Sequence, residues 1–342
     1  IGAARPSIAD PFLPKKIEEG RFDDIRECIG CNICVSGDMT QGISRCTQNT
    51  AFMEEWRKGW HPERVHPKGK SESVLIVGAG PAGLEAAHIL GKRGYQVTLA
   101  EATTTLGGRV ARERLLPGLS AWGRVADYRA GQIAPMPNVQ TYLDSRLTPD
   151  DILSFGIQHV AIATGCQWRR DAVARLHLHP IPTDPAMPIF TPDDLMAGGG
   201  PAGGNVLLYD DDHFYMGSVL AELLVARGCT VHFVTPAVKV AEWTDNTLEQ
   251  ATIQRRLADL GVILHLSHAP DAIHATRADL TCIWSGKTLT LDCDAILMVT
   301  SRRPEDALYH ALKTCDWQAA GIASVKLIGD AAAPGPIAWA TY

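Results

Sequence analysis

Four cysteines near the start of the chain have a spacing that suits an iron-sulfur cluster. Cys28, Cys31 and Cys34 are each separated by two residues, and Cys46 follows after eleven more. Small and polar residues between them let the chain turn back, so that four sulfurs converge. A single structural zinc prefers two separate C-x2-C pairs and is the weaker alternative. We predict that these four thiolates hold a 4Fe-4S cluster, which transfers one electron at a time and does not carry hydride chemistry.

A glycine-rich turn is the second chemical motif. Gly78, Gly80 and Gly83 form GxGxxG within "SVLIVGAGPAGLEAAHILGKRGYQVTLAEA", and Glu101 follows eighteen residues after Gly83. The glycines allow a tight turn and a close approach of the backbone to a pyrophosphate, which the N-terminus of the next helix attracts. Glu101 can accept hydrogen bonds from both ribose hydroxyls of an adenosine. The pattern predicts a site for FAD or ADP, two nucleotides that need the same contacts here.

Two further stretches extend this predicted nucleotide site. A second glycine pair, Gly107 and Gly108, stands beside Arg109, a combination that flavin disulfide-reductase-like folds carry near the phosphates. Near the C-terminus, "LIGD" contains Gly329 and Asp330, which we expect to contact the second phosphate or the ribityl chain. The remaining predicted contacts flank these motifs and are Pro81, Ala82, Ala102, Ala163, Thr164 and Gly165.

These motifs need two similar folds to position them. Residues 73–102 have the pattern of a strand, a glycine turn, a helix and a second strand, which is the unit of a parallel sheet. Residues 205–237 repeat this pattern with two extra residues in the turn. That turn, "YDDDHFYMG", carries aspartates 210–212, which would repel a pyrophosphate, and Thr235 stands where the first fold has its ribose-binding acid. We predict that the second fold has lost the ability to bind NAD(P)H.

Length and composition exclude several classes of partner. The chain has 342 residues, of which 46% are hydrophobic and 20% charged, with a formal net charge of −6. This length is enough for two or three domains. No long basic run marks a surface for nucleic acid, and no apolar run approaches the roughly 20 residues of a membrane span. We expect a cytoplasmic protein with no nucleic-acid partner and no membrane partner, whose five scattered cysteines are small buried hydrophobic residues.

Several stretches resemble one known family. They are "ARPSIADPFLPKKIEEGRFDDIRECIGCNICVSGD", "RCTQN", "EEWRKGWHPE" and "GAGPAGLEAA". They are similar to the C-terminal part of trimethylamine dehydrogenase and its relatives, which include dimethylamine and histamine dehydrogenases and iron-sulfur N-demethylases. In this family an FMN-binding (β/α)8 barrel of old-yellow-enzyme type precedes the cluster. Two domains folded like the flavin and nicotinamide domains of disulfide reductases follow it, and the first holds ADP in some members and FAD in others.

The resemblance implies an α/β fold with two Rossmann-like domains of the disulfide reductase type, preceded by a 4Fe-4S-binding linker and the last piece of the barrel. Ala4 and Arg5 match the barrel loop that binds the FMN phosphate. The expected parts are the barrel end (1–20), the cluster segment (21–70), the ADP- or FAD-binding domain (71–200 and 303–342) and the degenerate NAD(P)-like domain (201–302). Because most of the barrel is missing, we expect no catalytic residue here and either a fragment or a subunit with a barrel-bearing partner chain.

The resemblance also implies an activity. A small amine or N-methyl substrate would reduce FMN, the cluster would remove the electrons singly, and an electron-transferring flavoprotein would collect them, in an enzyme that forms a homodimer. Two alternatives remain. One is an NADPH-dependent enoate reductase of the dienoyl-CoA reductase kind, against which the aspartate-containing turn argues. The other is a non-catalytic electron-transfer subunit that serves a separate barrel protein.

Overall fold

The computed structural model describes residues 3–342, apart from the side chain of Asp38. These residues form two compact units. Unit 1 contains the described residues up to Arg114, together with Ala121–Cys166 and Pro304–Tyr342, and unit 2 contains Leu115–Ser120 and Gln167–Arg303. Within this described part of the chain, no helix combines the length and the apolar character that crossing a membrane requires.

A five-stranded parallel sheet forms the centre of unit 1. Its strands lie in the order β15 (Ser324–Leu327), β4 (His159–Ile162), β1 (Ser73–Val77), β2 (Gln96–Ala100) and β3 (Val139–Tyr142). The chain proceeds from β1 to β2 and β3 on one side, and β4 pairs with the opposite edge of β1. The strand order therefore reverses between β1 and β4. In doubly wound sheets, ligands bind beyond the carboxyl ends of the strands at such a reversal.

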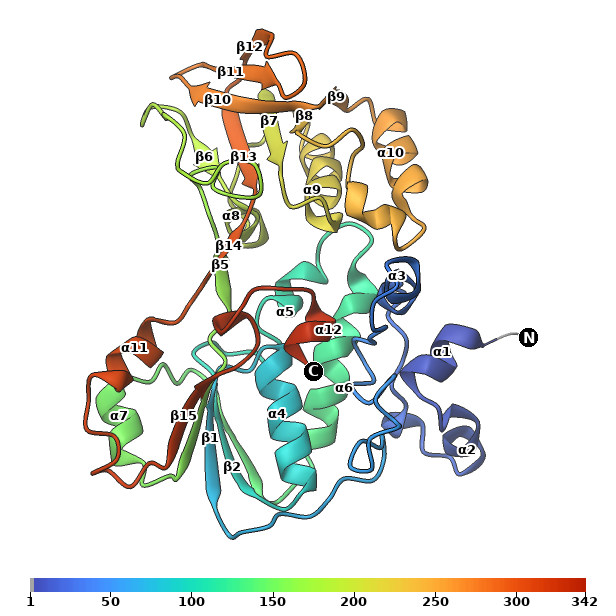
Figure 1. The fold of residues 1–342 in the computed structure, drawn as a ribbon, viewed down its shortest axis with the longest axis vertical. Helices are drawn as coiled ribbons and strands as arrows, with labels where there is room; N and C mark the ends of the chain where they lie inside the picture. The colour runs from blue at the N-terminus through green and yellow to red at the C-terminus, as the bar shows by residue number, and fades with distance from the viewer. Residues whose placement is uncertain (1–2) are drawn as a thin grey trace. The chain divides into compact units, whose positions relative to one another are not determined.

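Helices cover both faces of this sheet. The helices of unit 1 are α1 (Ala4–Ala9), α2 (Leu13–Glu18), η1 (Phe22–Asp24), α3 (Ile33–Met39), α4 (Pro81–Lys92), α5 (Val110–Glu113), α6 (Arg124–Ile133), α7 (Pro149–Ser154), α11 (Ala307–Lys313), η4 (Gly329–Ala331) and α12 (Ile337–Ala340). Side chains alternate between the faces of a strand, so Ile76 of β1 packs with α4 and Leu75 packs with α7 and α11. Figure 1 shows these helices on opposite sides of the strands.

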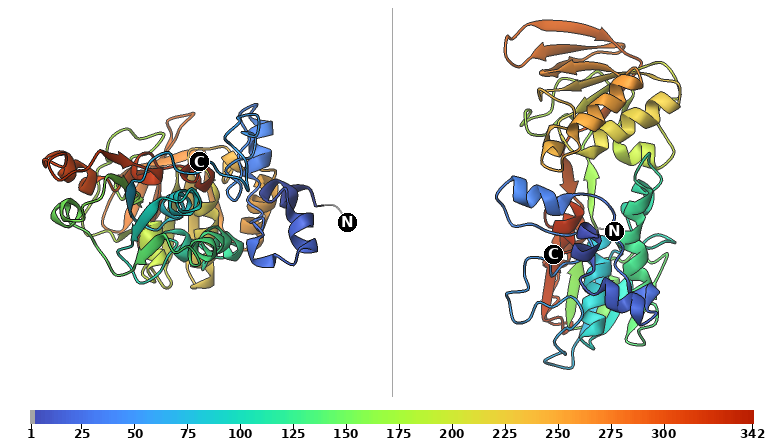
Figure 2. Two further views of the ribbon diagram at one scale, coloured as in Figure 1. Left: turned by 90° about the horizontal axis from the view of Figure 1, so that it is seen from below. Right: turned by 90° about the vertical axis from the view of Figure 1, so that its right-hand side faces the viewer.

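Residues 3–72 contain short helices but no strand, as the lack of a hydrophobic period predicts. Ion pairs hold this segment together: Lys16 contacts Asp10 at 2.7 Å, and Arg26 contacts Glu63 at 2.5 Å. Figure 1 and the right-hand view of Figure 2 place residues 3–72 on the side of the sheet that carries α4 and α6. The cysteine segment therefore lies beside the helix that follows the glycine turn.

Unit 2 has a second parallel sheet and a smaller antiparallel one. The parallel order is β6 (Ile189–Phe190), β13 (Ala295–Val299), β7 (Asn205–Asp210), β8 (Thr230–Thr235) and β9 (Ile263–Leu266), and the antiparallel order is β10 (His268–Ile273), β11 (Arg277–Cys282) and β12 (Thr288–Asp292). The helices are α8 (Pro192–Met196), α9 (Tyr215–Ala226), η3 (Glu242–Asp245) and α10 (Gln250–Asp259). Leu207 of β7 packs in one apolar cluster with Leu280 of β11, so the antiparallel sheet covers one face of the parallel sheet.

The internal repeat predicted from the sequence is present in the fold. β7, α9 and β8 repeat the arrangement of β1, α4 and β2, with parallel pairing in both. In unit 1 the helix starts eight residues after the start of the strand, and in unit 2 it starts ten residues after. The two additional residues lie in the aspartate-containing turn.

The boundary between the predicted domains differs from the division in the structure. We expected the chain to pass from the first domain to the second near residue 200. In the structure it passes from unit 1 to unit 2 at Cys166–Gln167, and the glycine-rich stretch before β7 lies within unit 2. The reason is that β6 pairs with β13, more than a hundred residues later, and α8 contacts both strands. Three short elements lie where the chain passes between the units: η2 (Ser120–Gly123), β5 (Cys166–Trp168) and β14 (Arg302–Pro304).

Candidate functional site

The glycine turn lies at the reversal of the first sheet. Gly78 has a φ of +103°, and a Cβ there would collide with the carbonyl oxygen of Ala163 at the end of β4. A Cβ on Gly83 would collide with the carbonyl oxygen of Gly78. Both positions therefore require glycine, which lets α4 start close to β1 with its first N–H groups at the turn. Pro81, the first residue of α4, already has the backbone angle that a helix needs there.

The second glycine pair packs against this turn. Gly107 has a φ of +111°, and its N–H donates to the carbonyl oxygen of Ala79 at 2.9 Å. A Cβ on Gly108 would lie 2.9 Å from the Cα of Gly80. Gly329 approaches the same place, because a Cβ there would collide with the side chain of Ala82. Three glycine motifs that are far apart in the sequence therefore surround the N-terminus of α4.

Glu101 connects the end of β2 with the glycine turn. It is 7% exposed, and its Oε2 accepts the N–H of Ala79 at 2.8 Å. Its Oε1 accepts the N–H and the hydroxyl of Thr103, at 2.9 and 2.8 Å. The carboxylate of Glu101 thus lies beside the glycine turn. Its binding of a nucleotide ribose stays a prediction. Ala102 follows directly, and the role of Thr103 was not visible in the sequence pattern.

Arg109 and Asp330 lie on either side of Cys166. Arg109 Nη2 donates to the carbonyl oxygen of Cys166 at 2.5 Å, and the thiol donates to Asp330 Oδ2 at 3.1 Å. Cys166 is half-buried with a polar partner, and Cys282 and Cys315 are half-buried too, so the prediction of small buried hydrophobic residues is wrong for these three cysteines. The place of Cys166 directly after the predicted 163–165 stretch is the signal that could have found it. Within that stretch, the hydroxyl of Thr164 and the carbonyl of Gly165 bond to the main chain of Glu305.

The four predicted cluster ligands are all half-buried in the same segment. Burial raises the pKa of the Cys31 thiol to about 11, and the neighbouring Cys46 and Cys34 add to this shift. Burial also raises the pKa values of Cys34 and Cys46, with smaller contributions from Cys28. Such thiols carry charge at neutral pH only when a metal replaces the proton.

Four cysteine sulfurs are the ligand type that iron-sulfur clusters use. The four thiols lie close enough to influence one another's pKa values. Among the side chains that the structure describes, no three His, Cys, Asp or Glu groups are arranged to hold a metal ion. Ligation by these cysteines therefore stays a prediction.

Ala4 and Arg5 lie in the first turn of α1, so the predicted phosphate-binding loop is helical here. The first two residues of the expected barrel end (1–20) fall outside the described residues. Arg5 donates to the side chain of Asn32, between two of the cysteines. These residues therefore belong to the cysteine segment and not to the nucleotide turn, and a flavin phosphate on them stays a prediction.

A buried arginine joins the cysteine segment to the nucleotide-binding fold. Arg129 of α6 is fully buried, and its Nε donates to Glu85 of α4 at 2.5 Å. Its Nη1 donates to the side chain of Gln48 at 2.9 Å, and its Nη2 to the carbonyl oxygen of Thr47 at 3.0 Å. Thr47 and Gln48 directly follow the fourth cysteine. Sequence reasoning missed this network, whose partners are more than eighty positions apart.

In unit 2 an aspartate fills the turn that corresponds to the glycine turn. Asp210, at the end of β7, is fully buried, and its Oδ1 accepts the N–H groups of Asp212 and His213 at 3.2 Å each. A Cβ on Gly217 of α9 would lie 2.9 Å from the Asp210 Cγ. The carboxylate therefore takes the N–H groups and the space next to the helix that a pyrophosphate would need.

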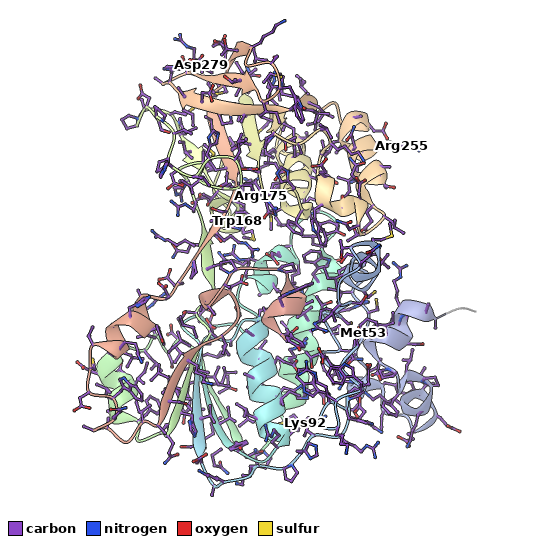
Figure 3. The ribbon with its side chains drawn as sticks, viewed as in Figure 1. Met53, Lys92, Trp168, Arg175, Arg255 and Asp279 are labelled. Carbon is purple, nitrogen blue, oxygen red and sulfur yellow. The ribbon has the colours of Figure 1, made fainter. Side chains whose placement is uncertain are left out.

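Burial favours the protonated form of two carboxyl groups in this turn. It raises the pKa of Asp210 to about 7 and that of Asp212 to about 6. Asp211 bonds to the ring of His213 at 3.0 Å. Arg175, labelled in Figure 3, donates to the carbonyl oxygen of Asp212 at 3.3 Å. The turn is thus closed by its own side chains and has no glycine loop.

Two protein-family models match parts of the chain. The model of an NAD(P)-binding Rossmann-like domain matches residues 76–145, which include the glycine turn. The model of an OYE-like second alpha/beta domain matches residues 190–293 in unit 2. The first match contains β2 and β3 of unit 1, and the second contains β7–β9 together with the antiparallel strands β10–β12.

Known proteins match over the whole chain. It is 40% identical to dimethylamine dehydrogenase of Hyphomicrobium sp. (strain x), covering 100% of this chain and 50% of that protein. The structure of histamine dehydrogenase from Rhizobium sp. 4-9 matches with 63% identity and a TM-score of 0.98, over 100% of this chain and 53% of that one. The structure of a 2-naphthoyl-CoA reductase matches with 26% identity and a TM-score of 0.81, over 98% of this chain and 48% of that one. The chain thus spans about half the length of these relatives.

Proposed function

Because this chain belongs to the family of dimethylamine and histamine dehydrogenases, we propose that it forms the electron-transfer and nucleotide-binding part of an iron-sulfur flavoprotein that oxidises a small amine or an N-methyl group. The observation that carries this proposal is the match to histamine dehydrogenase over the whole chain at 63% identity. The remaining half of such an enzyme would supply an FMN-binding barrel and the residues that contact the amine.

Cys28, Cys31, Cys34 and Cys46 would hold a 4Fe-4S cluster in this enzyme. When bound, the cluster supplies one-electron transfer between the flavin and an acceptor. The chain's own contribution is to keep the four sulfurs half-buried, which limits access of water to them. The Arg129 network would fix this segment against the nucleotide-binding fold.

The glycine motifs around α4 would bind ADP or the ADP part of FAD. The turn from Gly78 to Gly83 would offer main-chain N–H groups to the pyrophosphate, and Glu101 would accept the ribose hydroxyls. The match of the NAD(P)-binding domain model to this stretch supports a dinucleotide-type site.

An electron-transferring flavoprotein is the proposed acceptor, and not NAD(P)+. The buried Asp210 occupies the turn of unit 2 in which a nicotinamide dinucleotide would place its pyrophosphate. Since that carboxyl group already uses the N–H groups and fills the space beside Gly217, the site lacks what a dinucleotide needs. The second candidate function is an NADPH-dependent enoate reductase, which the likeness to 2-naphthoyl-CoA reductase favours.

Anaerobic reduction of the full-length natural protein separates these functions. A panel of methylated and primary amines should bleach the flavin absorbance, and an added electron-transferring flavoprotein should restore it, whereas NADP+ should not. NADPH should leave the flavin oxidised. Reduction of the flavin by NADPH, with no response to any amine, would favour the enoate reductase.

A further inference from the structure

The side chain of Thr47 lies against one of the proposed cluster ligands. Its hydroxyl oxygen is 3.3 Å from the sulfur of Cys31, and Thr47 is 5% exposed. In a metal-free protein either group can donate this hydrogen bond. A metal-bound thiolate carries no proton and can only accept, so the hydroxyl is then the donor.

We infer that the Thr47 hydroxyl donates a hydrogen bond to the Cys31 sulfur and thereby raises the reduction potential of the cluster, an inference that rests on the proposed function. One added electron makes the sulfurs more negative, and no proton moves in this step. A hydrogen bond to a sulfur is therefore stronger in the reduced state, which favours reduction. Thr47 acts through the sulfur and is a positioning and tuning residue.

The position of Thr47 is fixed by the buried arginine. Arg129 donates to the Thr47 carbonyl oxygen at 3.0 Å and to the side chain of the adjacent Gln48 at 2.9 Å. Gln48 in turn donates to the carbonyl oxygen of Glu27 at 3.0 Å, next to the first cysteine. Arg129 itself is held by Glu85 of α4. The main chain of Thr47 is therefore held in place by residues of the nucleotide-binding fold.

The sulfurs also receive bonds from the main chain, and that of Cys31 receives one from Ile33. The N–H of Gly30 donates to the sulfur of Cys28 at 3.4 Å, and main-chain groups near Cys34 and Cys46 lower the pKa values of those thiols against the larger effect of burial. A substitution leaves these N–H donors in place. Thr47 offers a side-chain donor, which a substitution of nearly equal shape can remove.

The test compares Thr47→Val with Thr47→Ser in the full-length holoprotein, by redox titration followed by EPR. Thr47→Val should shift the midpoint potential to a more negative value, by about the 59 mV that a tenfold change in a one-electron equilibrium represents. Thr47→Ser should keep the wild-type potential. Thr40→Val is the matched control, because the Thr40 hydroxyl bonds to the Ser36 carbonyl oxygen at 2.8 Å and not to a sulfur.

Iron and sulfide contents are measured on every variant. Should Thr47→Val retain its cluster and the wild-type potential, the inference is overturned while the proposed function stands. A wild-type protein without iron would instead remove the proposed cluster itself. If Thr47→Val does not retain the cluster, the test uses Arg129→Lys, which loosens the main chain of Thr47 without deleting its hydroxyl. A negative shift of the midpoint potential in this variant supports the inference, and an unchanged potential overturns it.

Discussion

At the scale of single residues, Arg129 is the largest fully buried side chain in the described part of the chain. Its guanidinium is fully buried and donates to a carboxylate, an amide and two main-chain carbonyls. A buried charge is tolerated only where it is paired and its donors are used. The ion pair with Glu85 meets this condition, and Arg129 thereby links the cysteine segment to both α4 and α6.

We predict that Arg129→Met destabilises the protein by about 3 kcal/mol or more, since it leaves the Glu85 carboxylate buried without its partner. Urea unfolding of the holoprotein measures this loss. The matched control is Arg114→Met, whose guanidinium pairs with Asp127 at the surface and should change the stability by no more than about 1 kcal/mol. Equal losses for the two variants would contradict the importance of the buried network.

At the scale of elements, the two repeats show how one fold can keep or lose a phosphate site. In β1–α4 the turn is built from glycines, and Gly83 lets the helix start against the strand. In β7–α9 two more residues are present, and the Asp210 carboxylate caps the turn from within. The same strand–helix–strand arrangement is present in both repeats, so the proposed difference in ligand binding would come from the turn.

The glycine turn leads to a second prediction. Gly83→Ala should lose bound nucleotide and destabilise the protein by about 1–3 kcal/mol, because the new methyl group collides with the Gly78 carbonyl oxygen and pushes α4 away. Gly131→Ala in α6 is the control, since nothing lies within 4 Å of its added Cβ, and it should stabilise the helix by up to about 1 kcal/mol. Chromatography of the released nucleotide and thermal unfolding check both. Full nucleotide content in Gly83→Ala would argue against this site.

The acidic turn predicts a pH dependence of stability in unit 2. Burial raises the pKa of Asp210 from the ordinary aspartate value of 3.8 to about 7, so the native state binds a proton that the unfolded state has released above pH 4. The stability that this group contributes is therefore complete below about pH 4 and is lost as the pH rises through about 7. Asp210→Asn should unfold at a higher temperature than wild type at pH 8 and at a similar temperature at pH 4. An equal difference at both pH values would contradict this assignment.

The repeat and the glycine turn could be predicted from the sequence because their signals are local. Apolar runs such as residues 74–77, a glycine turn and a helix follow one another within thirty residues. The pairing of β6 with β13 could not be predicted, since two residues have no period and their partner lies more than a hundred positions away. The bonds of Arg129 to Thr47 and of Cys166 to Asp330 were missed for the same reason: only the folded chain brings these residues together.

At the scale of the whole molecule, the chain spans about half of each relative that it matches from end to end. The proposed enzyme therefore needs a flavin-bearing part beyond the residues described here. Within this half, unit 1 combines a dinucleotide-type turn with four cysteines, and unit 2 has a related fold whose turn is closed. This combination supports the proposal that the protein passes single electrons to another protein and does not exchange hydride with NAD(P)H.

The most direct test of this account is an iron and acid-labile sulfide determination on the anaerobically purified full-length protein, with an EPR spectrum recorded after reduction by a substrate amine. We predict four iron and four sulfide per chain and one paramagnetic cluster signal, both lost in Cys46→Ser. Zinc in place of iron, or a reduced flavin without any cluster signal, would contradict the central claim that these four cysteines hold an electron relay.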